Sequence, residues 1–478
     1  MKDMAAGGRR DSPLTAKEAK DAIENTVRES IPPGKKPVTQ ATQTRLAQLQ
    51  QQLDDLINRE ILPIDPSFSL TQKIEPISFE QIQSLIDEDT AILEWYLGDD
   101  NFLVFIITRQ SESPIVWQSS SEDNSALMHW ANEYWHNYYE DQQAWQEQLS
   151  RRLENLAHIL HLDEILDYLP ETFDQLILIP HRILNCFPLH ALPLADGSCL
   201  LDRFFGRVRY VPSCQLLQLI QTRQRPEFTN FLGIQNPGDN LPFADLEIEM
   251  IKGYFPSVNV LARTAATKDA LNNQTLNSVH CLHFSGNSAF NRYSPLQSAL
   301  FLADSLISTI PANSNPSQYW TLSENAAIDL SKCLTVEEIF QLDLSQCRLV
   351  NLSACETALT DWTSASDEYI GFPSAFLLAG SASVVGSLWA PSDLSTALLM
   401  IELYRNLQLG STVEVALNEA QIWLRDITKR ELEQWIVKQL QLPPAVKMNL
   451  RRRLYQFEDD AQPFREPLHW AAFCAIGQ

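Results

Sequence analysis

The chain has 478 residues, with 36 Lys and Arg against 60 Asp and Glu, which gives a formal net charge of −24 at pH 7. This charge repels phosphate backbones and anionic lipid surfaces, so it argues against nucleic acid and membranes as partners and favours basic or neutral proteins. Apolar residues at 45% and charged residues at 20% are typical of a globular protein. Eight cysteines without a CxxC pair predict neither a disulfide scaffold nor a zinc site, which favours a reducing, cytoplasmic location.

The first 75 residues differ in composition from the rest of the chain. Residues 1–40 mix charges with Gly and Pro and carry few large apolar side chains, which predicts a disordered arm. Within residues 41–75, leucines recur at three- and four-residue spacing from Thr42 to Leu62, which predicts an amphipathic helix followed by a linker. Such a helix would serve as a docking element or as the end of a helical array. No stretch of about 18 apolar residues predicts a membrane span, and no signal peptide is expected.

Strands and helices alternate over residues 80–225. A hairpin is predicted at 91–97 and 102–108, followed by a Gln- and Glu-rich helical stretch at 121–161. Further strands at 175–180 and 207–211 and a helix at 215–222 complete a layered α/β unit.

The alternation restarts over residues 226–478. Strands are predicted at 230–234, 258–261, 279–284, 348–352 and 382–388, with helices between them at 244–255, 266–273, 335–341, 371–378 and 394–407. Three further helices at 411–428, 431–440 and 443–455 precede a last extended segment at 468–476. This pattern predicts a doubly wound, mostly parallel sheet, whose functional groups gather at the carboxyl ends of the strands. Two such ends are polar, at 285–288 and 353–357.

One of these ends carries a recognisable motif. The stretch Leu349-Val-Asn-Leu-Ser-Ala-Cys355-Glu-Thr-Ala-Leu359 closely resembles the nucleophile segment of CHAT domains, caspase-like domains that are common in bacteria and often attached to TPR arrays. Further segments resemble the same family, namely Pro180-His-Arg182, Pro188-Leu-His-Ala-Leu-Pro193, Leu282-His-Phe-Ser-Gly286, Pro295 to Asp304, Gly371 to Gly380, Ser387-Leu-Trp389 and His469-Trp-Ala-Ala-Phe473. A more distant resemblance extends to separases and caspases.

The resemblance runs from about residue 80 to the end and implies a fold. That fold is a caspase-like, three-layer α/β/α arrangement with a mostly parallel sheet, preceded by the helical or disordered N-terminal segment. It has two halves, an upstream pseudo-protease-like half at 80–225 and a downstream protease half at 226–478.

The resemblance also implies site residues. Cys355 stands at the nucleophile position, and the family places the dyad histidine in a His-Gly pair that is Asn287-Ser288 here. An amide does not titrate near neutrality, and losing one member of a nucleophile–base pair costs roughly 10⁴ to 10⁶ in rate. Without a cation nearby to lower its pKa, Cys355 is expected to stay protonated. By family analogy, the backbone N–H groups of Ser288 and Cys355 would form the oxyanion hole.

Other polar residues near the motif are weaker candidates. An acidic pocket that selects Arg or Lys could use Asp304, Glu356, Glu368 or Asp393, although each could equally be a loop cap or a solvated acid. His283 lies about 13 Å before Asn287 on the same strand face, too far to replace the missing base. His181, His190 and His469 are interpreted as structural. Because residues 280 and 281 point to opposite faces of a strand, His280, Cys281 and His283 do not predict a metal site.

Three functions remain open from the sequence. The first is a CHAT-domain protein of the cysteine peptidase type that is inactive or strongly impaired as an enzyme. It would act as a protein- or peptide-binding regulatory module in signalling or defence in bacteria, for example in cyanobacteria. The second is an active cysteine endopeptidase that cleaves a protein after a basic residue. The third is a scaffold that docks a TPR or other helical-repeat protein. No P-loop, GxGxxG, HExxH or GxSxG motif occurs, so no cofactor is expected.

Overall fold

The computed structural model describes residues 59, 77–223, 225–311, 314–323, 326–362, 369–439 and 444–478. The arm predicted at 1–40 and, apart from residue 59, the helix and linker predicted at 41–75 therefore lie outside the described residues. None of the helices in these ranges combines the length and apolar character that crossing a bilayer requires.

An 11-stranded sheet forms the centre of the described chain, in the order β3-β2-β1-β4-β5-β17-β16-β15-β8-β6-β7. Its strands are β1 Thr90–Leu97, β2 Phe102–Thr108, β3 Ile115–Gln118, β4 Gln175–Ile179, β5 Arg207–Tyr210, β6 Asn230–Gln235, β7 Ser257–Ala262, β8 Cys281–Ser285, β15 Leu349–Ser353, β16 Ser383–Ser387 and β17 Phe473–Gly477. Antiparallel pairing is confined to β1–β2, β2–β3 and β16–β17 among the described strands of this sheet. The sheet is therefore mostly parallel, as predicted.

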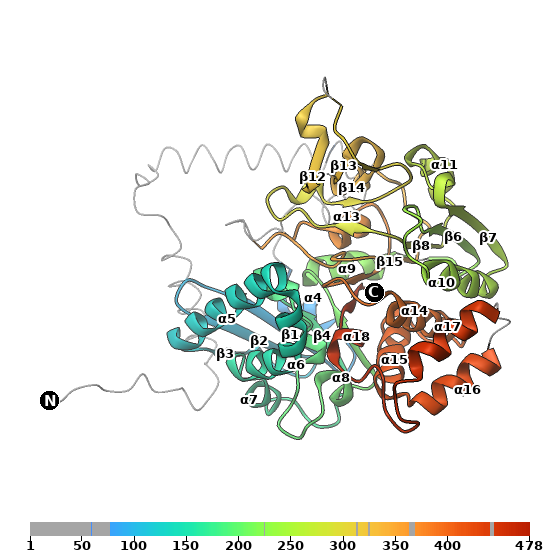
Figure 1. Ribbon diagram of the computed structural model, residues 1–478. Helices are drawn as coiled ribbons and strands as arrows, with labels where there is room; N and C mark the ends of the chain where they lie inside the picture. Colours follow the sequence, from blue (N-terminus) through green and yellow to red (C-terminus); the bar gives the residue numbers. More distant parts are fainter. Residues whose placement is uncertain are drawn as a thin grey trace.

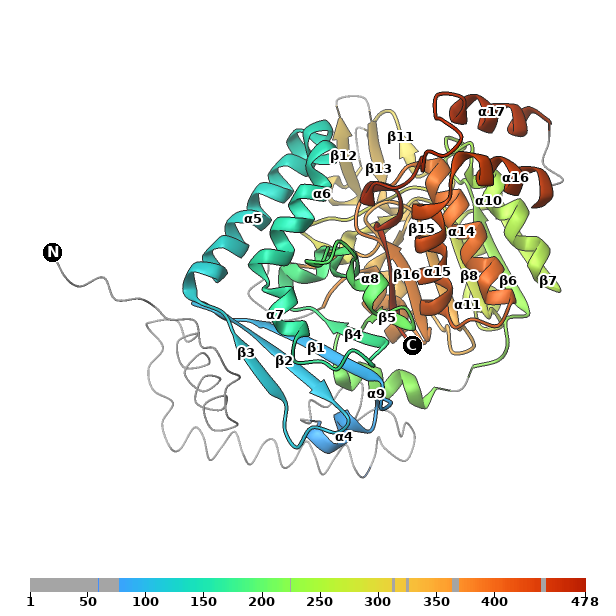
Figure 2. The ribbon, with the colours of Figure 1, turned by 90° about the horizontal axis from the view of Figure 1, so that it is seen from below.

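Helices cover both faces of this sheet (Figures 1 and 2). They are α4 Phe79–Gln83, α5 Ser121–Glu140, α6 Gln142–Ile159, α7 Leu162–Leu166, α8 Leu200–Arg203, α9 Cys214–Thr222, α10 Ala244–Ile251, α11 Asn273–Leu276, α12 Val336–Ile339, α13 Phe372–Leu378, α14 Asp393–Gln408, α15 Val413–Asp426, α16 Lys429–Gln439, α17 Pro444–Leu454 and α18 Pro467–Trp470. The three-layer α/β/α class predicted from the sequence is confirmed.

Alternating side chains explain the two helical layers over the upstream strands. Ile92 of β1 and Ile177 of β4 belong to a small apolar cluster with residues of α4 and α9. Their chain neighbours Leu93 and Leu176 point to the opposite face, into the main core that includes α5 and α6. Because successive strand residues face opposite sides, a strand that is apolar at every position must be covered on both.

The helical stretch predicted at 121–161 is confirmed, and it consists of α5 and α6, because Asp141 leaves helical geometry and its side chain accepts the N–H of Ala144 at the start of α6. Two other local predictions were wrong. The helix expected at 266–273 is replaced by 3₁₀ turns at Arg263–Ala265 and Lys268–Ala270. There the Ala266 carbonyl accepts the N–H of Ala303 instead of continuing a helix. The segment expected to be extended from 468 begins with α18, and its strand starts only at residue 473.

Two small antiparallel sheets were not predicted. One pairs β9 Ser288–Ala289, β10 Ala299–Leu300 and β14 Leu334–Thr335, and the other pairs β11 Leu306–Ile307, β12 Tyr319–Ser323 and β13 Ala326–Asp329. In Figure 1 the second of these stands at the top of the downstream part. Four of these six strands, β9, β10, β11 and β14, have only two residues, too few to show a periodicity in the sequence.

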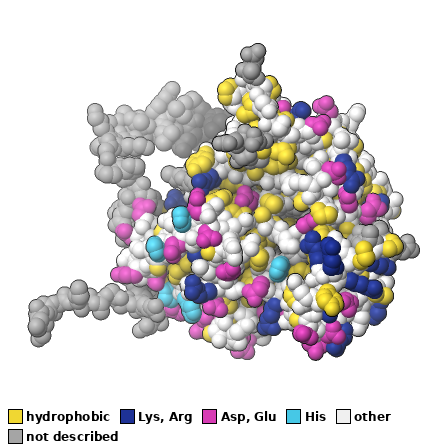
Figure 3. Space-filling view, in the orientation of Figure 1, with side chains coloured by type: hydrophobic (Ala, Val, Ile, Leu, Met, Phe, Trp, Pro, Cys, Tyr) yellow, Lys and Arg dark blue, Asp and Glu magenta, His cyan; other side chains and the backbone are white. Residues whose placement is uncertain are grey.

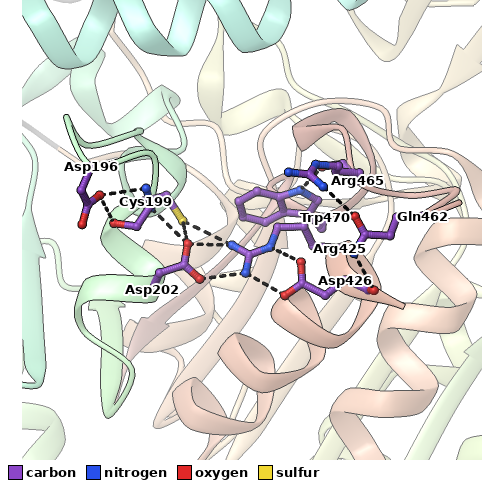
Figure 4. Close-up of polar contacts among 9 residues, drawn as sticks. Asp196, Cys199, Asp202, Arg425, Asp426, Gln462, Arg465 and Trp470 are labelled. Atoms are coloured by element: carbon purple, nitrogen blue, oxygen red, sulfur yellow. Dashed lines mark hydrogen bonds and ion pairs between the residues drawn. The ribbon is translucent and has the colours of Figure 1, made fainter. Parts of the chain in front are cut away.

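The upstream and downstream strands meet at β5 and β17, which pair only at Ile476 and Tyr210. A polar cluster on one side of this junction, drawn in Figure 4, adds to the contact. Arg425 of α15 donates two hydrogen bonds to Asp202 of α8, at 2.9 and 2.8 Å, and its guanidinium lies 5.6 Å from the centre of the Trp470 ring. The main apolar core also includes residues from both sides, so the two sets of strands share one interior.

Candidate functional site

Cys355 lies in the turn that follows β15, at the carboxyl ends of β8 and β15. Ser387, at the end of neighbouring β16, fixes this turn through three hydrogen bonds. Its hydroxyl donates to the Ala354 carbonyl, its carbonyl accepts the N–H of Ala358 at 2.7 Å, and its own N–H donates to Thr357 Oγ1 at 2.9 Å. The half-buried Cys355 thiol is therefore presented by a turn held on the sheet.

Asn287 lies two residues after β8 and faces a different loop. Its Nδ2 donates to Oδ1 of Asn240 at 2.8 Å. That loop follows β6 and is organised by Asn236, which has a left-handed φ of 46° and whose Oδ1 accepts the N–H groups of Asn240 and Leu241 at 3.1 and 3.2 Å. The Asn287 amide is thus oriented by a preformed loop.

The Cys355 thiol has surroundings that disfavour ionisation. Burial and, to a smaller extent, the neighbouring Glu356 carboxylate raise its pKa from 9.0 to about 11. All nine histidines lie in the described residues, and their contacts are to groups other than this thiol. His181 accepts the N–H of Leu97, His190 contacts Tyr210, and His469 packs against Phe464. No neighbouring imidazole therefore supports a thiolate.

Two backbone N–H groups at the site, those of Ser288 and Cys355, have no backbone acceptor among the described residues. Phe301 donates its N–H to the Asn287 carbonyl at 2.9 Å, so residues 287 and 301 form a hydrogen-bonded pair of the β9–β10 ladder. Such pairs alternate with non-hydrogen-bonded pairs in an antiparallel ladder, and the next pair, Ser288 and Leu300, is therefore of the second kind. The Ser288 N–H therefore points away from β10, while the Ser288 hydroxyl donates to the Cys355 carbonyl. Within the described residues, the Cys355 N–H makes no backbone hydrogen bond.

Glu356 connects the site to the upstream helices. It adopts a left-handed φ of 58°, a sparsely populated conformation for a residue with a side chain, and its Oε1 accepts the Tyr138 hydroxyl of α5 at 2.8 Å. The same hydroxyl accepts the N–H of Ala390 at 3.3 Å. Burial raises the pKa of the Glu356 carboxyl. Glu356 therefore has an internal partner.

The other three acidic candidates occupy different surroundings. Asp393 is the first residue of α14, its Oδ2 accepts the N–H of Phe243 at 3.1 Å, and burial raises its pKa. Asp304 is exposed and has a φ of 60°. Glu368 lies outside the described residues.

A buried polar network lies directly beneath the site. His283 and Glu247 are fully buried side chains of β8 and α10, with Nε2 and Oε1 2.8 Å apart. The second Glu247 oxygen accepts the Ser285 hydroxyl at 3.0 Å, and the Tyr404 hydroxyl of α14 lies 3.0 Å from His283 Nδ1. His283 thus has a polar group close to each ring nitrogen within the core, although Nε2 and Glu247 Oε1 lie within ion-pair distance without hydrogen-bond geometry.

A groove of about 780 Å³ opens between α5, the β1–β2 turn, Trp362 and the segment after β9. Trp135 of α5 and Trp362 stack across its wall with ring centres 4.7 Å apart, and Trp362 also stacks on Phe290 at 5.7 Å. Tyr139, next to the Tyr138 that bonds Glu356, lines the groove as well. Helix α5 therefore supplies aromatic side chains to this groove and, through Tyr138, a contact to Glu356 next to Cys355.

Sequence reasoning missed Asn240, Glu247 and Tyr138. Asn240 had a usable signal, because Asn236-Pro-Gly-Asp-Asn240 directly follows a predicted parallel strand and so lies at the functional edge of the sheet. Glu247 and Tyr138 lie within helical patterns, where nothing marks a partner elsewhere in the chain.

Comparison with known proteins places this arrangement in context. Residues 144–478 match the CHAT domain. The structure of the Saccharomyces cerevisiae separase–securin complex aligns with a TM-score of 0.47 and 12% identity, over 83% of this chain and 30% of that one. The Arg-specific cysteine proteinase gingipain R aligns with a TM-score of 0.36 and 9% identity, over 69% of this chain and 67% of that one. This chain thus spans about a third of the separase chain. Among proteins of curated function, none matches significantly.

Proposed function

Because the chain belongs to the CHAT domain family, we propose that it is a protein of the cysteine peptidase type that binds a protein or peptide segment at the Cys355 end of the sheet but is inactive or strongly impaired as an enzyme. The observation that carries this proposal is the Asn287–Asn240 contact. An amide pair occupies the position where the family resemblance implies a dyad histidine.

The chemistry follows from what an amide lacks. A cysteine peptidase needs a group that removes the thiol proton and returns a proton to the leaving amine. Asn287 has no titratable nitrogen, and the pKa of Cys355 is raised to about 11, so the thiol remains protonated at neutral pH. Loss of one member of such a pair costs roughly 10⁴ to 10⁶ in rate.

Binding of a peptide requires hydrogen-bond donors and a groove but no base, and the site offers the first two. The Ser288 and Cys355 N–H groups are available to a peptide carbonyl, as an oxyanion hole requires. The groove at α5 offers aromatic faces together with both signs of charge, since Asp99, Glu140, Arg182 and Arg292 line it. A peptide backbone with mixed side chains fits such a lining.

We assign this module a regulatory role in bacterial signalling or defence, in the cytoplasm, with a TPR or other helical-repeat protein as a partner. The support is the family resemblance and the charge of −24, which favours basic or neutral protein surfaces. The alternative function, an active endopeptidase that cleaves after a basic residue, has one specific observation in its favour: the half-buried Cys355 retained at the nucleophile position.

Cleavage of Arg- and Lys-containing peptides separates the two functions. The unmodified chain should show no Cys355-dependent cleavage, whereas Asn287→His should restore it, because Asn240 Oδ1 already stands where it can accept an imidazole N–H. In the Asn287→His background, Asn240→Ala should lower the restored cleavage rate about tenfold or more, since one charge-assisted hydrogen bond to the imidazolium is lost.

Cys355→Ala in each background is the matched control, and equilibrium binding of the same peptides tests the binding proposal separately. Cleavage by the unmodified chain that disappears in Cys355→Ala would establish the endopeptidase. Absence of peptide binding in every variant would refute the binding module.

A further inference from the structure

A second cavity, of about 350 Å³, lies away from Cys355 and is lined mainly by polar residues. The first residues of four strands contribute to it, Thr90 of β1, Gln175 of β4, Arg207 of β5 and Ser383 of β16. Arg348, which directly precedes β15, and the N-terminal turn of α15 complete the wall. Since Cys355 follows the carboxyl end of β15, the cavity and the thiol lie at opposite ends of that strand.

Two of the lining arginines come from one face of β5. Val208 and Tyr210 point into the main core, so Arg207 and Arg209 point to the other face. The register across the sheet aligns Arg207 with Gln175, and Gln175 with Thr90. Polar side chains of three neighbouring strands thus lie in a row that faces the cavity. The other residues on this face of the strands are mainly isoleucines.

Arg209 is the most informative of these residues. It is only 6% exposed, and its Nε has no hydrogen-bond partner within the described residues. Its nearest ion-pair contact is long, with 3.9 Å between Nη1 and Glu414 Oε1. A buried guanidinium carries five donors, and leaving them unmade costs free energy, so this side chain is built to meet an acceptor in the cavity.

The remaining wall has the same character. The Arg348 guanidinium packs 5.0 Å from the centre of the Phe228 ring, which leaves its N–H edge for an acceptor. Thr412, the N-cap of the 14-residue helix α15, makes no side-chain cap hydrogen bond, so the N–H groups of the first turn are not capped by it. A helix N-terminus with uncapped N–H groups favours anions.

The net charge of the side chains that line the cavity has the opposite sign to the net charge of the whole chain. Three arginines and the carboxylates of Asp87 and Glu414 are the charged side chains of its lining, a net side-chain charge of +1 in a protein of −24, and Gln478 also lines it, with its main-chain oxygen accepting the Ser383 hydroxyl. Glu414 Oε1 lies 3.2 Å from Arg207 Nε, and Oε2 has no hydrogen-bond partner in the described residues. Glu414 therefore neutralises only part of the arginine cluster and competes with any anion that enters.

We propose that this cavity binds a small organic phosphate, with the phosphoryl group held by Arg209, Arg207 and Arg348 at the N-terminus of α15. Guanidinium groups match phosphate oxygens in a bidentate fork. The volume of about 350 Å³ lies at the lower end of the range for small-molecule pockets, which accommodates a group attached to the phosphoryl rather than a bare ion. This inference does not depend on the function proposed for Cys355.

The test is isothermal titration and thermal unfolding of the full chain with inorganic phosphate, pyrophosphate, AMP and citrate, each against NaCl of equal ionic strength. We expect saturable binding, tighter for AMP than for inorganic phosphate and weakest for citrate. Arg348→Gln should weaken AMP binding about tenfold or more, because a charge-assisted contact is lost. Glu414→Gln should tighten it, a gain that misfolding cannot imitate.

Arg451→Gln, an exposed arginine of α17, is the matched control for the change in net charge and should leave binding unchanged. A response equal to that of NaCl for all four probes would overturn the proposal. So would identical AMP affinities in the unmodified chain, Arg348→Gln and Glu414→Gln. Tighter binding of inorganic phosphate than of AMP would overturn the assignment to an organic phosphate.

Discussion

Two positions four residues apart on the same segment have opposite surroundings. His283, in the middle of β8, is completely buried, with Glu247 on one ring nitrogen and Tyr404 on the other. Asn287, beyond the end of β8, lies at the surface of the site, and its amide donates to Asn240. The chain therefore keeps an imidazole and a carboxylate together in the core, while position 287 at the end of the segment carries an amide.

The difference teaches that polar groups near a site need not belong to its chemistry. His283, Glu247 and Tyr404 bring polar groups of β8, α10 and α14 together in the core, whereas Asn287 and Cys355 lie in loops beyond the ends of β8 and β15. A nearby histidine in the sequence is consequently a poor guide to the presence of a base. Each side of the comparison can be altered separately.

The largest expected effect is on the buried side. Glu247→Ala removes the partner of both His283 and Ser285 and leaves the imidazole buried without its carboxylate. Breaking a buried pair in this way costs roughly 3–5 kcal/mol in the free energy of unfolding. Urea unfolding would measure the loss, with Glu249→Ala on the exposed face of the same helix as the control. Equal stabilities for the two variants would show that the buried network is unimportant to the fold.

A smaller effect is expected on the thiol side. Glu356→Gln removes the charge that helps raise the Cys355 pKa while keeping an oxygen for Tyr138, so the pKa should fall below about 11 and the thiolate fraction at pH 8 should rise. One pKa unit corresponds to about tenfold in that fraction. The alkylation rate with iodoacetamide, followed by mass spectrometry from pH 7 to 10, measures this change.

The other seven cysteines are buried, and Cys355→Ser provides the background labelling rate. In the unmodified chain the rate should rise about tenfold per pH unit over this range, because thiolate is scarce below the pKa. A rate in the unmodified chain that is already maximal at pH 7 would contradict the raised pKa and the impaired site together.

The smallest effect is expected at Tyr404. Tyr404→Phe keeps the buried ring but removes the hydroxyl that contacts His283 Nδ1 and, at 3.4 Å, Cys281 Sγ. One unsatisfied buried group costs about 1–3 kcal/mol, less than the loss of the carboxylate. Unfolding in urea again supplies the measurement, and a loss larger than that of Glu247→Ala would reverse the order of importance within the network.

Much of the architecture followed from the sequence pattern, because strands such as β6, β8 and β15 are short, mostly apolar runs bounded by turns. The helix expected at 266–273 failed because a distant partner, Ala303, takes the carbonyl that the helix would have used. The motif located Cys355 and Asn287, but their neighbours Asn240 and Tyr138 come from other elements. Contacts that join residues 138 and 356 depend on how the layers pack, and no local pattern carries that information.

The position of β17 has a consequence for how the protein is made. This strand lies in the middle of the sheet, between β5 and β16, yet every other described strand precedes it in the chain. During synthesis the ribosome therefore releases the two flanking groups of strands first, each with an open edge facing the other. Exposed edges invite pairing with other chains. The sheet closes only when residues 473–477 have emerged, so the interval before their release is when the nascent protein most needs protection by chaperones.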